Sequence, residues 1–529
     1  MSQKRDFCLN MLLLHIVSNN SDYSLIEVNN CYFYTKLSYI CTVNQKARTL
    51  SKLNIVDHQN TKIVATLGPA STSPEMLIKL IEAGVNVFRL NFSHGSHEMH
   101  AGTVDKIMKI KEDYNVNVGI LADLQGPKLR VGKIENEGIE IEEGDILTFV
   151  NEPCIGNHDK IYMSYKEFAK DVNVGEQVLI DDGKLVLEVV ETNEVDKVKL
   201  KVLFGGTLSS NKGVNLPQTK ISLPSLTEKD LKDLEFILTL PVNWIALSFV
   251  RKAQDIKELK KKISDANHPA KVIAKIEKPE AVSRIKEIVK ATDAIMIARG
   301  DLGVEVPIEQ LPAIQKQIIK RCIQRAKPVI VATQMMESMI TNPSPTRAEV
   351  TDVANAVLDG ADAVMLSGET SVGRHPHIVV KAMNKIIEEA EKHYEMKNKR
   401  PKPNPDSSTF LSDNICLNAP KIAEEINAKA ITGLTVSGYT AFKMSSYRPK
   451  SPIYIFSDRK HLLSTLNLVW GVKCFHYEKF TTTDETITDL CTILKKNEIV
   501  VPGDVIVNTS SMPIQKRFRT NMLKITIVE

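Results

Sequence analysis

Short apolar runs alternate with longer amphipathic stretches from residue 62 onward. The short runs are rich in β-branched residues, as strands are, whereas apolar residues in the longer stretches recur with the period of a helix. Eight strand-like runs lie at residues 62–66, 85–93, 118–123, 244–250, 271–277, 294–301, 328–334 and 363–369. Helical stretches include residues 74–83, 280–290 and 308–326. This α/β pattern predicts a closed (β/α)8 TIM barrel, in which active-site residues lie at the carboxyl ends of the strands.

The connection between the third and fourth runs is far longer than the others. Residues 128–222 are rich in valine, glycine and acidic residues, with strand-like segments at 177–180 and 197–203 and turn sequences between them. Long insertions in a compact domain are usually functional. We therefore predict a barrel formed by residues 61–127 and 223–394, with a small β-barrel lid domain inserted at 128–222.

A second boundary follows the barrel at a charged, proline-rich linker, residues 397–405. Beyond it, a helical stretch at 422–428 precedes strand-like runs at 431–436, 453–456, 505–508 and 522–528. We predict a C-terminal α/β domain over residues 395–529.

Residues 1–60 stand outside this pattern, and we expect a poorly ordered extension or an over-long start. The apolar stretch 11–17 is too short to span a bilayer. Lys4 and Arg5 precede it as in a secretory signal, but no small-residue cleavage site follows at 18–21.

Length, net charge and cysteine spacing limit the classes to which this protein can belong. A chain of 529 residues predicts two to four domains, and a net charge of +4 argues against a dedicated nucleic-acid binder. The eight cysteines include no C-x-x-C pair, so we expect neither disulfides nor a zinc site, and a reducing cytoplasm. We expect no membrane span.

Polar residues gather where the predicted barrel strands end. Side chains of a strand alternate between faces, so residues two apart share one face. The residues are Arg89, Asn91, Ser93, Asp123, Lys275, Glu277, Arg299, Asp301, Thr333 and Glu369. Any one of them alone is more often a turn, cap or solvated ion-pair residue. Together they would place several charges in one cavity. Burying an unpaired charge costs free energy, and a bound ligand would lower that cost.

The residue types indicate a metal and an anion. Glu277 and Asp301 offer the oxygen ligands that Mg²⁺ accepts, while Lys275 and Arg89 would face an anion. Residues 298–301 open a helix whose N–H groups suit a carboxylate or phosphate. Phosphoryl transfer depends mainly on positioning and charge neutralisation, which this inventory matches.

Seven segments together resemble the successive motifs of pyruvate kinases. They are TKIVATLGP (61–69), FRLNFSHG (88–95), DLQGP (123–127), IAKIEK (273–278), ARGDLGV (298–304), ATQMM (332–336) and MLSGET (365–370). The resemblance runs in order over residues 61–529. It implies transfer of a phosphoryl group from phosphoenolpyruvate to ADP in glycolysis, giving pyruvate and ATP. It also implies a cytoplasmic homotetramer that uses Mg²⁺, with Mn²⁺ as a substitute.

The resemblance assigns roles at the barrel end. It implies that Lys275 stabilises the transferring phosphoryl group and the enolate, and that Arg89 binds phosphate. Thr333 and the amides of Gly300 and Asp301 would hold the pyruvyl carboxylate. The metal ligands would be Glu277 and Asp301.

The nucleotide would lie against residues of both the barrel and the lid. The residues implied are Asn91, His94, Arg130, Asp182 and Lys212. Val372 departs from the family, in which many members have a lysine there, and so removes one cation. The inserted domain would close over the site and exclude water.

The monovalent-cation site shows a second departure. In this family Asn91, Ser93, Asp123 and Leu124 would surround K⁺, and many members carry a glutamate where this chain has Lys128. An ammonium group can supply the positive charge that K⁺ otherwise brings. We therefore expect that K⁺ is not required, the alternative being that Lys128 points to solvent.

The C-terminal domain carries a small-residue turn between a strand and a helix. Thr435, Ser437, Gly438 and Thr440 offer donors suited to a phosphate, and relatives bind a sugar-phosphate activator here. Residues 510–520 depart from the family's glycine-rich final loop, so a plain turn is the alternative, and the effector stays open.

Two other functions compete. A metal-dependent lyase acting on phosphoenolpyruvate would need no nucleotide lid, so the insertion with Arg130 and Lys212 argues against it. A non-catalytic metabolite sensor would have no need of Lys275, Glu277 and Thr333.

Overall fold

The computed structural model describes Leu53, residues 59–394 and residues 401–529. The predictions for residues 1–52 and 54–58, and for the linker residues 395–400, lie outside the described residues. Residues 53–529 form one compact unit. Among the described residues, no helix is long and apolar enough to cross a membrane.

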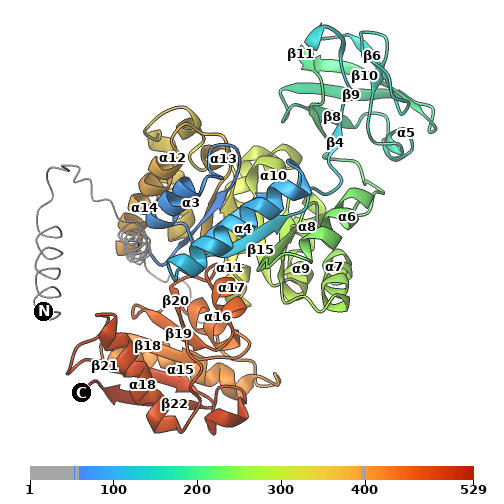
Figure 1. Ribbon diagram of the computed structural model, residues 1–529. Coiled ribbons are helices and arrows are strands. Elements are labelled where there is room, and N and C mark those ends of the chain that lie inside the picture. The colour runs from blue at the N-terminus through green and yellow to red at the C-terminus, as the bar shows by residue number, and fades with distance from the viewer. Residues whose placement is uncertain (1–52, 54–58, 395–400) are drawn as a thin grey trace, which may run out of the picture. The chain divides into compact units, whose positions relative to one another are not determined.

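Eight parallel strands close into a barrel, as the sequence predicted (Figure 1). The strands are β1 (Lys62–Thr66), β2 (Val87–Asn91), β3 (Gly119–Asp123), β13 (Trp244–Leu247), β14 (Lys271–Ile276), β15 (Ala294–Ala298), β16 (Val329–Ala332) and β17 (Ala363–Leu366). Neighbours follow the order β1-β17-β16-β15-β14-β13-β3-β2. Several strands end before the predicted run does, because the polar residues at their carboxyl ends belong to loops or to the next helix.

Helices surround the barrel and cover the outer face of its strands (Figure 1). They are α3 (Pro74–Glu82), α4 (His97–Asp113), α6 (Glu228–Ile237), α7 (Ala253–Asp265), α8 (Pro279–Ser283), α9 (Ile285–Ala291), α10 (Arg299–Glu305), α11 (Leu311–Gln324), α12 (Arg347–Leu358), α13 (Gly368–Ser371) and α14 (Pro376–Lys392). The helical stretch predicted at 280–290 forms two consecutive helices, α8 and α9, which are separated at Arg284. The stretch predicted at 308–326 begins as a 3-10 turn, and α11 starts only where Pro312 can occupy a first-turn position.

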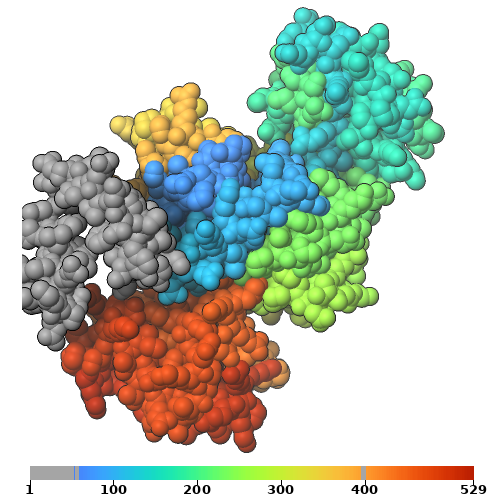
Figure 2. Space-filling view, in the orientation of Figure 1, coloured from blue at the N-terminus to red at the C-terminus, as the bar shows by residue number. Residues whose placement is uncertain are grey.

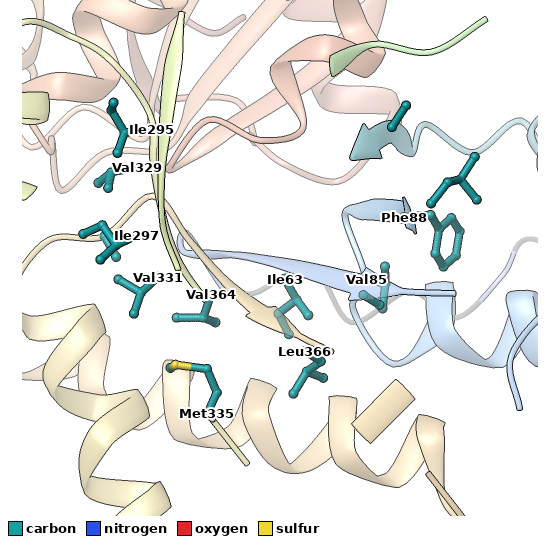
Figure 3. Packing of buried hydrophobic residues seen from close by; sticks show 14 of the residues in the cluster. Ile63, Val85, Phe88, Ile295, Ile297, Val329, Val331, Met335, Val364 and Leu366 are labelled. Atoms are coloured by element: carbon teal, nitrogen blue, oxygen red, sulfur yellow. The ribbon is translucent and has the colours of Figure 1, made fainter. Parts of the chain in front are cut away.

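Strand periodicity sorts the barrel residues into two cores. Val64 points into the barrel among other inward residues such as Trp244 and Met296, whereas Ile63 points outward beneath the helices. Figure 3 shows the outward layer, in which Val331 and Val364 lie near Met335. Both faces of each strand are therefore buried, which accounts for the nearly continuous apolar runs in the sequence.

The insertion forms a β-domain with its own core. Its seven-stranded sheet has the order β4-β12-β8-β9-β10-β6-β7, and β5 pairs with β11. The elements are β4 (Leu129–Arg130), β5 (Gly138–Ile141), β6 (Ile146–Val150), β7 (Ile161–Tyr162), α5 (Phe168–Asp171), β8 (Gln177–Ile180), β9 (Leu185–Thr192), β10 (Lys197–Phe204), β11 (Gly206–Ser209) and β12 (Gly213–Asn215). A bridge between Val131 and Met163 links the two edge strands. Its core includes Phe149, Val178 and Leu200. Figure 2 shows the outer surface of the domain.

The C-terminal domain is a five-stranded sheet of order β20-β19-β18-β21-β22, with only β22 antiparallel. Its elements are α15 (Phe410–Glu425), β18 (Ala430–Leu434), α16 (Tyr439–Ser446), β19 (Ile453–Ser457), α17 (Lys460–Leu466), β20 (Val472–His476), α18 (Thr483–Lys496), β21 (Val505–Ser510) and β22 (Met522–Ile527). The helix predicted at 422–428 is wrong in its bounds, because α15 continues through Pro420. Strand β20 has no counterpart among the predicted runs.

The C-terminal domain is attached at the amino-terminal end of the barrel strands. The Arg448 guanidinium lies 3.0 Å from the carboxylate of Asp362 and donates a 2.8 Å hydrogen bond to the carbonyl of Gly360. It also lies over the Trp470 ring, 4.8 Å from its centroid. On the other side, the Lys62 ammonium donates to the carbonyl of Val472. The opposite, carboxyl ends of the strands are thereby left for ligands.

Breaking the Arg448–Asp362 pair should destabilise this attachment. In an Arg448→Met variant the Asp362 carboxylate stays buried without its cation, so we expect the free energy of unfolding to fall by about 3 kcal/mol. Urea denaturation followed by fluorescence measures the change. A Lys392→Met variant, which removes an exposed pair with Glu389, should behave like the wild type. Equal stability of both variants would contradict the role of the buried pair.

Candidate active site

Charged side chains from three barrel strands meet at the carboxyl end of the barrel. Arg89 on β2 donates from Nε to Asp123 Oδ2 over 2.8 Å, and its Nη2 lies 2.7 Å from the same oxygen. Its Nη1 donates to Thr66 Oγ1 over 2.9 Å. Arg89 is nearly buried and Asp123 is fully buried. The guanidinium is therefore fixed in direction by strands β1 and β3.

Lys275 occupies the centre of this group. Its Nζ lies 2.9 Å from Glu277 Oε1 and 3.4 Å from Asp123 Oδ1, and it donates a 2.8 Å hydrogen bond to Ser248 Oγ. Burial opposes the charge of the ammonium, but the carboxylates of Asp123 and Glu277 outweigh burial and raise the pKa of Lys275. The lysine is therefore a permanent cation, suited to stabilise negative charge and unsuited to accept a proton.

Glu277 is a buried carboxylate whose two oxygens differ. Oε2 accepts a 2.6 Å hydrogen bond from the amide of Phe249, whereas Oε1 faces Lys275 and has no hydrogen-bond partner. Burial raises the pKa of Glu277, Lys275 opposes that rise, and the negative charge of Asp301 adds to it. Two neighbouring carboxylates, one of them buried, fit a divalent cation.

The donor set also limits which metal fits. Within the part of the chain that the structure describes, no group of three or more His, Cys, Asp or Glu side chains could hold a metal. Glu277 and Asp301 would thus supply only part of a coordination shell. Mg²⁺ accepts such a site, because it keeps waters and binds substrate oxygens alongside one or two carboxylates.

Gly300 and Thr333 lie together beside these charges. The amide of Gly300, in the first turn of α10, donates a 2.7 Å hydrogen bond to Thr333 Oγ1, which follows β16. Asp301 is the next residue of the same turn and is partly exposed. The predicted residues Arg89, Lys275, Glu277, Gly300, Asp301 and Thr333 therefore all lie at the carboxyl ends of β2, β14, β15 and β16.

Sequence reasoning missed several residues that contact this group. Thr66 and Ser248 orient Arg89 and Lys275, and the amide of Phe249 binds Glu277. Thr66 ends β1 and Ser248 follows β13, so both stand at strand ends like the residues that were selected. Their side chains are small and uncharged, so the pattern of charged residues at strand ends does not include them.

The residues expected around a monovalent cation are engaged in local bonds. Asn91 Oδ1 accepts from the amide of Ser93 over 3.1 Å, and the carbonyl of Leu124 accepts from Ser248 Oγ over 2.7 Å. Lys128 Nζ lies 3.9 Å from Asp301 Oδ1. The Lys128 side chain is exposed, and this contact directs its ammonium toward the barrel end.

The expected nucleotide residues divide into two groups. His94 lies in the loop after β2, where its carbonyl accepts from His100 Nε2. Arg130 and Lys212 lie in the inserted domain, where Arg130 donates to the carbonyl of Asn211 and Lys212 Nζ lies 2.9 Å from Asp181 Oδ1. The hydrogen bond from Lys212 lowers the pKa of Asp181, the residue before the predicted Asp182.

The buried carboxylate of Glu305 joins the inserted domain to the barrel. Glu305, the last residue of α10, lies 2.6 Å from Lys278 Nζ and accepts a 2.8 Å hydrogen bond from Asn215 Nδ2 on β12. Arg251 donates to the carbonyls of Ile221 and Leu223, at the return of the chain to the barrel. These contacts fix the point from which the inserted domain projects.

A separate pocket lies in the C-terminal domain, with a volume of about 220 Å³. Its wall includes Thr435, Ser437 and Thr440 together with Arg517 and Arg519 of the final loop. Gly438 shapes the turn with a φ of 81°, and its amide donates to Thr435 Oγ1.

Known proteins share both the sequence and the fold. Residues 58–380 match the family model for the barrel domain of pyruvate kinase, and residues 413–526 match the model for its alpha/beta domain. A pyruvate kinase of Geobacillus stearothermophilus is 42% identical, over 89% of this chain and 80% of its own length. One from Corynebacterium glutamicum is 43% identical, over 89% of this chain and 98% of its own.

A solved structure agrees with these relatives. The crystal structure of a pyruvate kinase from Cryptosporidium parvum has a TM-score of 0.84 and 36% identity to this chain, covering 89% of it and 97% of its own chain. The two family models together match most of the chain, and their order is that of the barrel and C-terminal sheets described above. The chain therefore belongs to the pyruvate kinase family.

Proposed function

We propose that this pyruvate kinase transfers the phosphoryl group of phosphoenolpyruvate to ADP at the carboxyl end of its barrel, with Lys275 as the central catalytic cation. The enzyme is a phosphotransferase that forms pyruvate and ATP, by family membership. The observation that carries the site is Lys275 held between two buried carboxylates, beside Arg89 and near Asp301.

Each barrel residue has a role that follows from its position. Arg89, fixed by Asp123, binds the phosphate of phosphoenolpyruvate. The amides of Gly300 and Asp301, together with the hydroxyl of Thr333, hold the carboxylate. Lys275 stabilises the transferring phosphoryl group and the enolate oxygen, where negative charge grows most.

The two carboxylates Glu277 and Asp301 hold the divalent cation. Bound Mg²⁺, or Mn²⁺ in its place, neutralises charge on the phosphoryl oxygens and orients them. The amide of Phe249 holds Glu277 Oε2, while Oε1 lies 2.9 Å from Lys275 Nζ, which keeps the catalytic cation and the metal ligand side by side.

The nucleotide lies between the barrel end and the inserted domain. Asn91 and His94 contact it from the barrel, while Arg130, Asp182 and Lys212 contact it from the lid. Closure of the lid excludes water, so that the phosphoryl group passes to ADP rather than to water. We place this chemistry in the cytoplasm on the strength of the family resemblance.

The pocket of the C-terminal domain is a candidate effector site. Two arginines and several hydroxyls line it, which suits a phosphorylated metabolite. Arg448 is buried against Asp362 and does not line this pocket.

A lactate-dehydrogenase-coupled assay with ADP and phosphoenolpyruvate tests the proposed function directly, with and without candidate sugar phosphates. In a Lys275→Met variant we expect kcat to fall at least about a thousandfold, because the lost charge acts mainly in the transition state. Binding of phosphoenolpyruvate and Mg²⁺ should change little.

A Lys271→Met variant is the matched control, because Lys271 lies on the same strand at the opposite end of the barrel. It should keep the wild-type kcat. If Lys275→Met keeps most of the wild-type kcat, Lys275 is not the catalytic cation.

Lys128 should make added K⁺ unnecessary. Its ammonium lies 3.9 Å from Asp301, close enough to supply a positive charge near the phosphate. We expect full activity in tetramethylammonium buffer with Mg²⁺ and no K⁺ or Na⁺, at matched ionic strength. A Lys128→Glu variant should acquire a K⁺ requirement. Negligible wild-type activity that about 100 mM K⁺ restores, roughly physiological ionic strength, would show that Lys128 does not replace the ion.

The assembly we propose is a homotetramer, on the strength of the family resemblance alone. Multi-angle light scattering at micromolar concentration should give four times the chain mass of 59.0 kDa. A monomer mass under those conditions would rule the tetramer out.

A further inference from the structure

Two charged residues at the strand ends have no part in the chemistry above. Arg299 follows β15 and Glu369 follows β17, and the loop after β16 lies between them in the barrel order. That loop begins with Thr333, whose hydroxyl accepts from Gly300. Both charged side chains bond to the backbone of this loop.

Arg299 is directed away from the catalytic cations and into the base of the loop. Its Nη2 donates to the carbonyl of Thr333 over 2.8 Å and lies 3.4 Å from that of Gln334. On the other side, Nη1 and Nη2 contact the two carboxylate oxygens of Asp352 over 2.7 and 2.6 Å. The buried guanidinium thereby ties the loop to α12 in a bidentate pair, a geometry that lysine cannot reproduce.

The loop backbone that Arg299 contacts has an unusual conformation. Thr333 has a φ of 68° and Gln334 a φ of 54°, which places two consecutive non-glycine residues in the left-handed region. A β-branched residue rarely adopts this conformation, and it persists only where the surroundings enforce it. Glu369 holds the other end of the loop, accepting from the amides of Met336 over 3.1 Å and Ser367 over 2.7 Å.

We propose that Arg299 is a positioning residue that holds Thr333 in this left-handed conformation, and thereby keeps its hydroxyl against α10 where the carboxylate of phosphoenolpyruvate binds. Without the guanidinium, the loop can relax to a negative φ, which moves the hydroxyl away from Gly300. The inference rests on the proposed function of Thr333 and goes beyond it, because it names what holds that residue in place.

An Arg299→Lys variant keeps the charge and loses the bidentate fork. We expect kcat/KM for phosphoenolpyruvate to fall on the order of a hundredfold, as for a reacting group displaced by about 1 Å. The KM for ADP should stay within about twofold of wild type, because the loop holds only the carboxylate side of the site. In an Arg299→Ala variant, free guanidinium well below its denaturing range should restore part of kcat/KM for phosphoenolpyruvate.

Two further variants separate positioning from plain stability. Arg448→Lys alters another buried arginine–aspartate pair, at the opposite end of the barrel, and should lower the unfolding midpoint without changing the KM for phosphoenolpyruvate. Asp352→Asn removes the anchor on α12, and Asp352 is partly exposed, so this variant should fold even if Arg299→Lys does not. It should raise the KM for phosphoenolpyruvate selectively, by about threefold to tenfold.

An unchanged KM for phosphoenolpyruvate in Arg299→Lys and Asp352→Asn, with an active wild type, would overturn the positioning role and leave the proposed function intact. Equal losses for both substrates without guanidinium rescue would also overturn it. A wild-type enzyme that is inactive with phosphoenolpyruvate and ADP would instead refute the proposed function itself.

Discussion

The burial of opposite charges at the carboxyl end of the barrel is the constraint on which the site depends. Arg89, Asp123, Lys275 and Glu277 lie within ion-pair distance of one another in a chain of contacts, and each is nearly or fully buried. Two cations and two carboxylates balance, so the group is tolerable without ligand. Removing any one member would leave an uncompensated buried charge, which is far more costly than losing a surface pair.

In the same group of charges, two buried carboxylate oxygens accept no hydrogen bond. Glu277 Oε1 and Asp123 Oδ1 have no hydrogen-bond partner, although both face the Lys275 ammonium. An anion brought to Lys275 together with a divalent cation brought to Glu277 would keep the charges balanced. Such a site binds a metal and a phosphorylated anion more readily together than separately, because each compensates the charge of the other.

The two ends of the barrel make different contacts. At the amino-terminal ends of the strands, Arg448 and Lys62 join the C-terminal domain to the barrel through Asp362, Gly360 and Val472. At the carboxyl ends, helix α10 presents Gly300 and Asp301 in its first turn and Glu305 at its last residue, where Asn215 of the inserted domain binds. A short helix thereby connects the group of charges at the barrel end with the base of the inserted domain.

The barrel follows from the sequence pattern alone, because strands buried on both faces read as short apolar runs and alternate with amphipathic helices. The sequence also selected Lys275, Glu277 and Thr333 as candidates, since charges at strand ends have no structural reason to recur. Their catalytic roles remain predictions. The partners of those residues become known only from the folded chain. Ser248 and Thr66 carry no charge that could mark them, Lys212 pairs with Asp181, and Arg299 turns toward the loop instead of the cavity. Direction and pairing depend on contacts between strands far apart in the chain, and periodicity along a single strand contains no information about them.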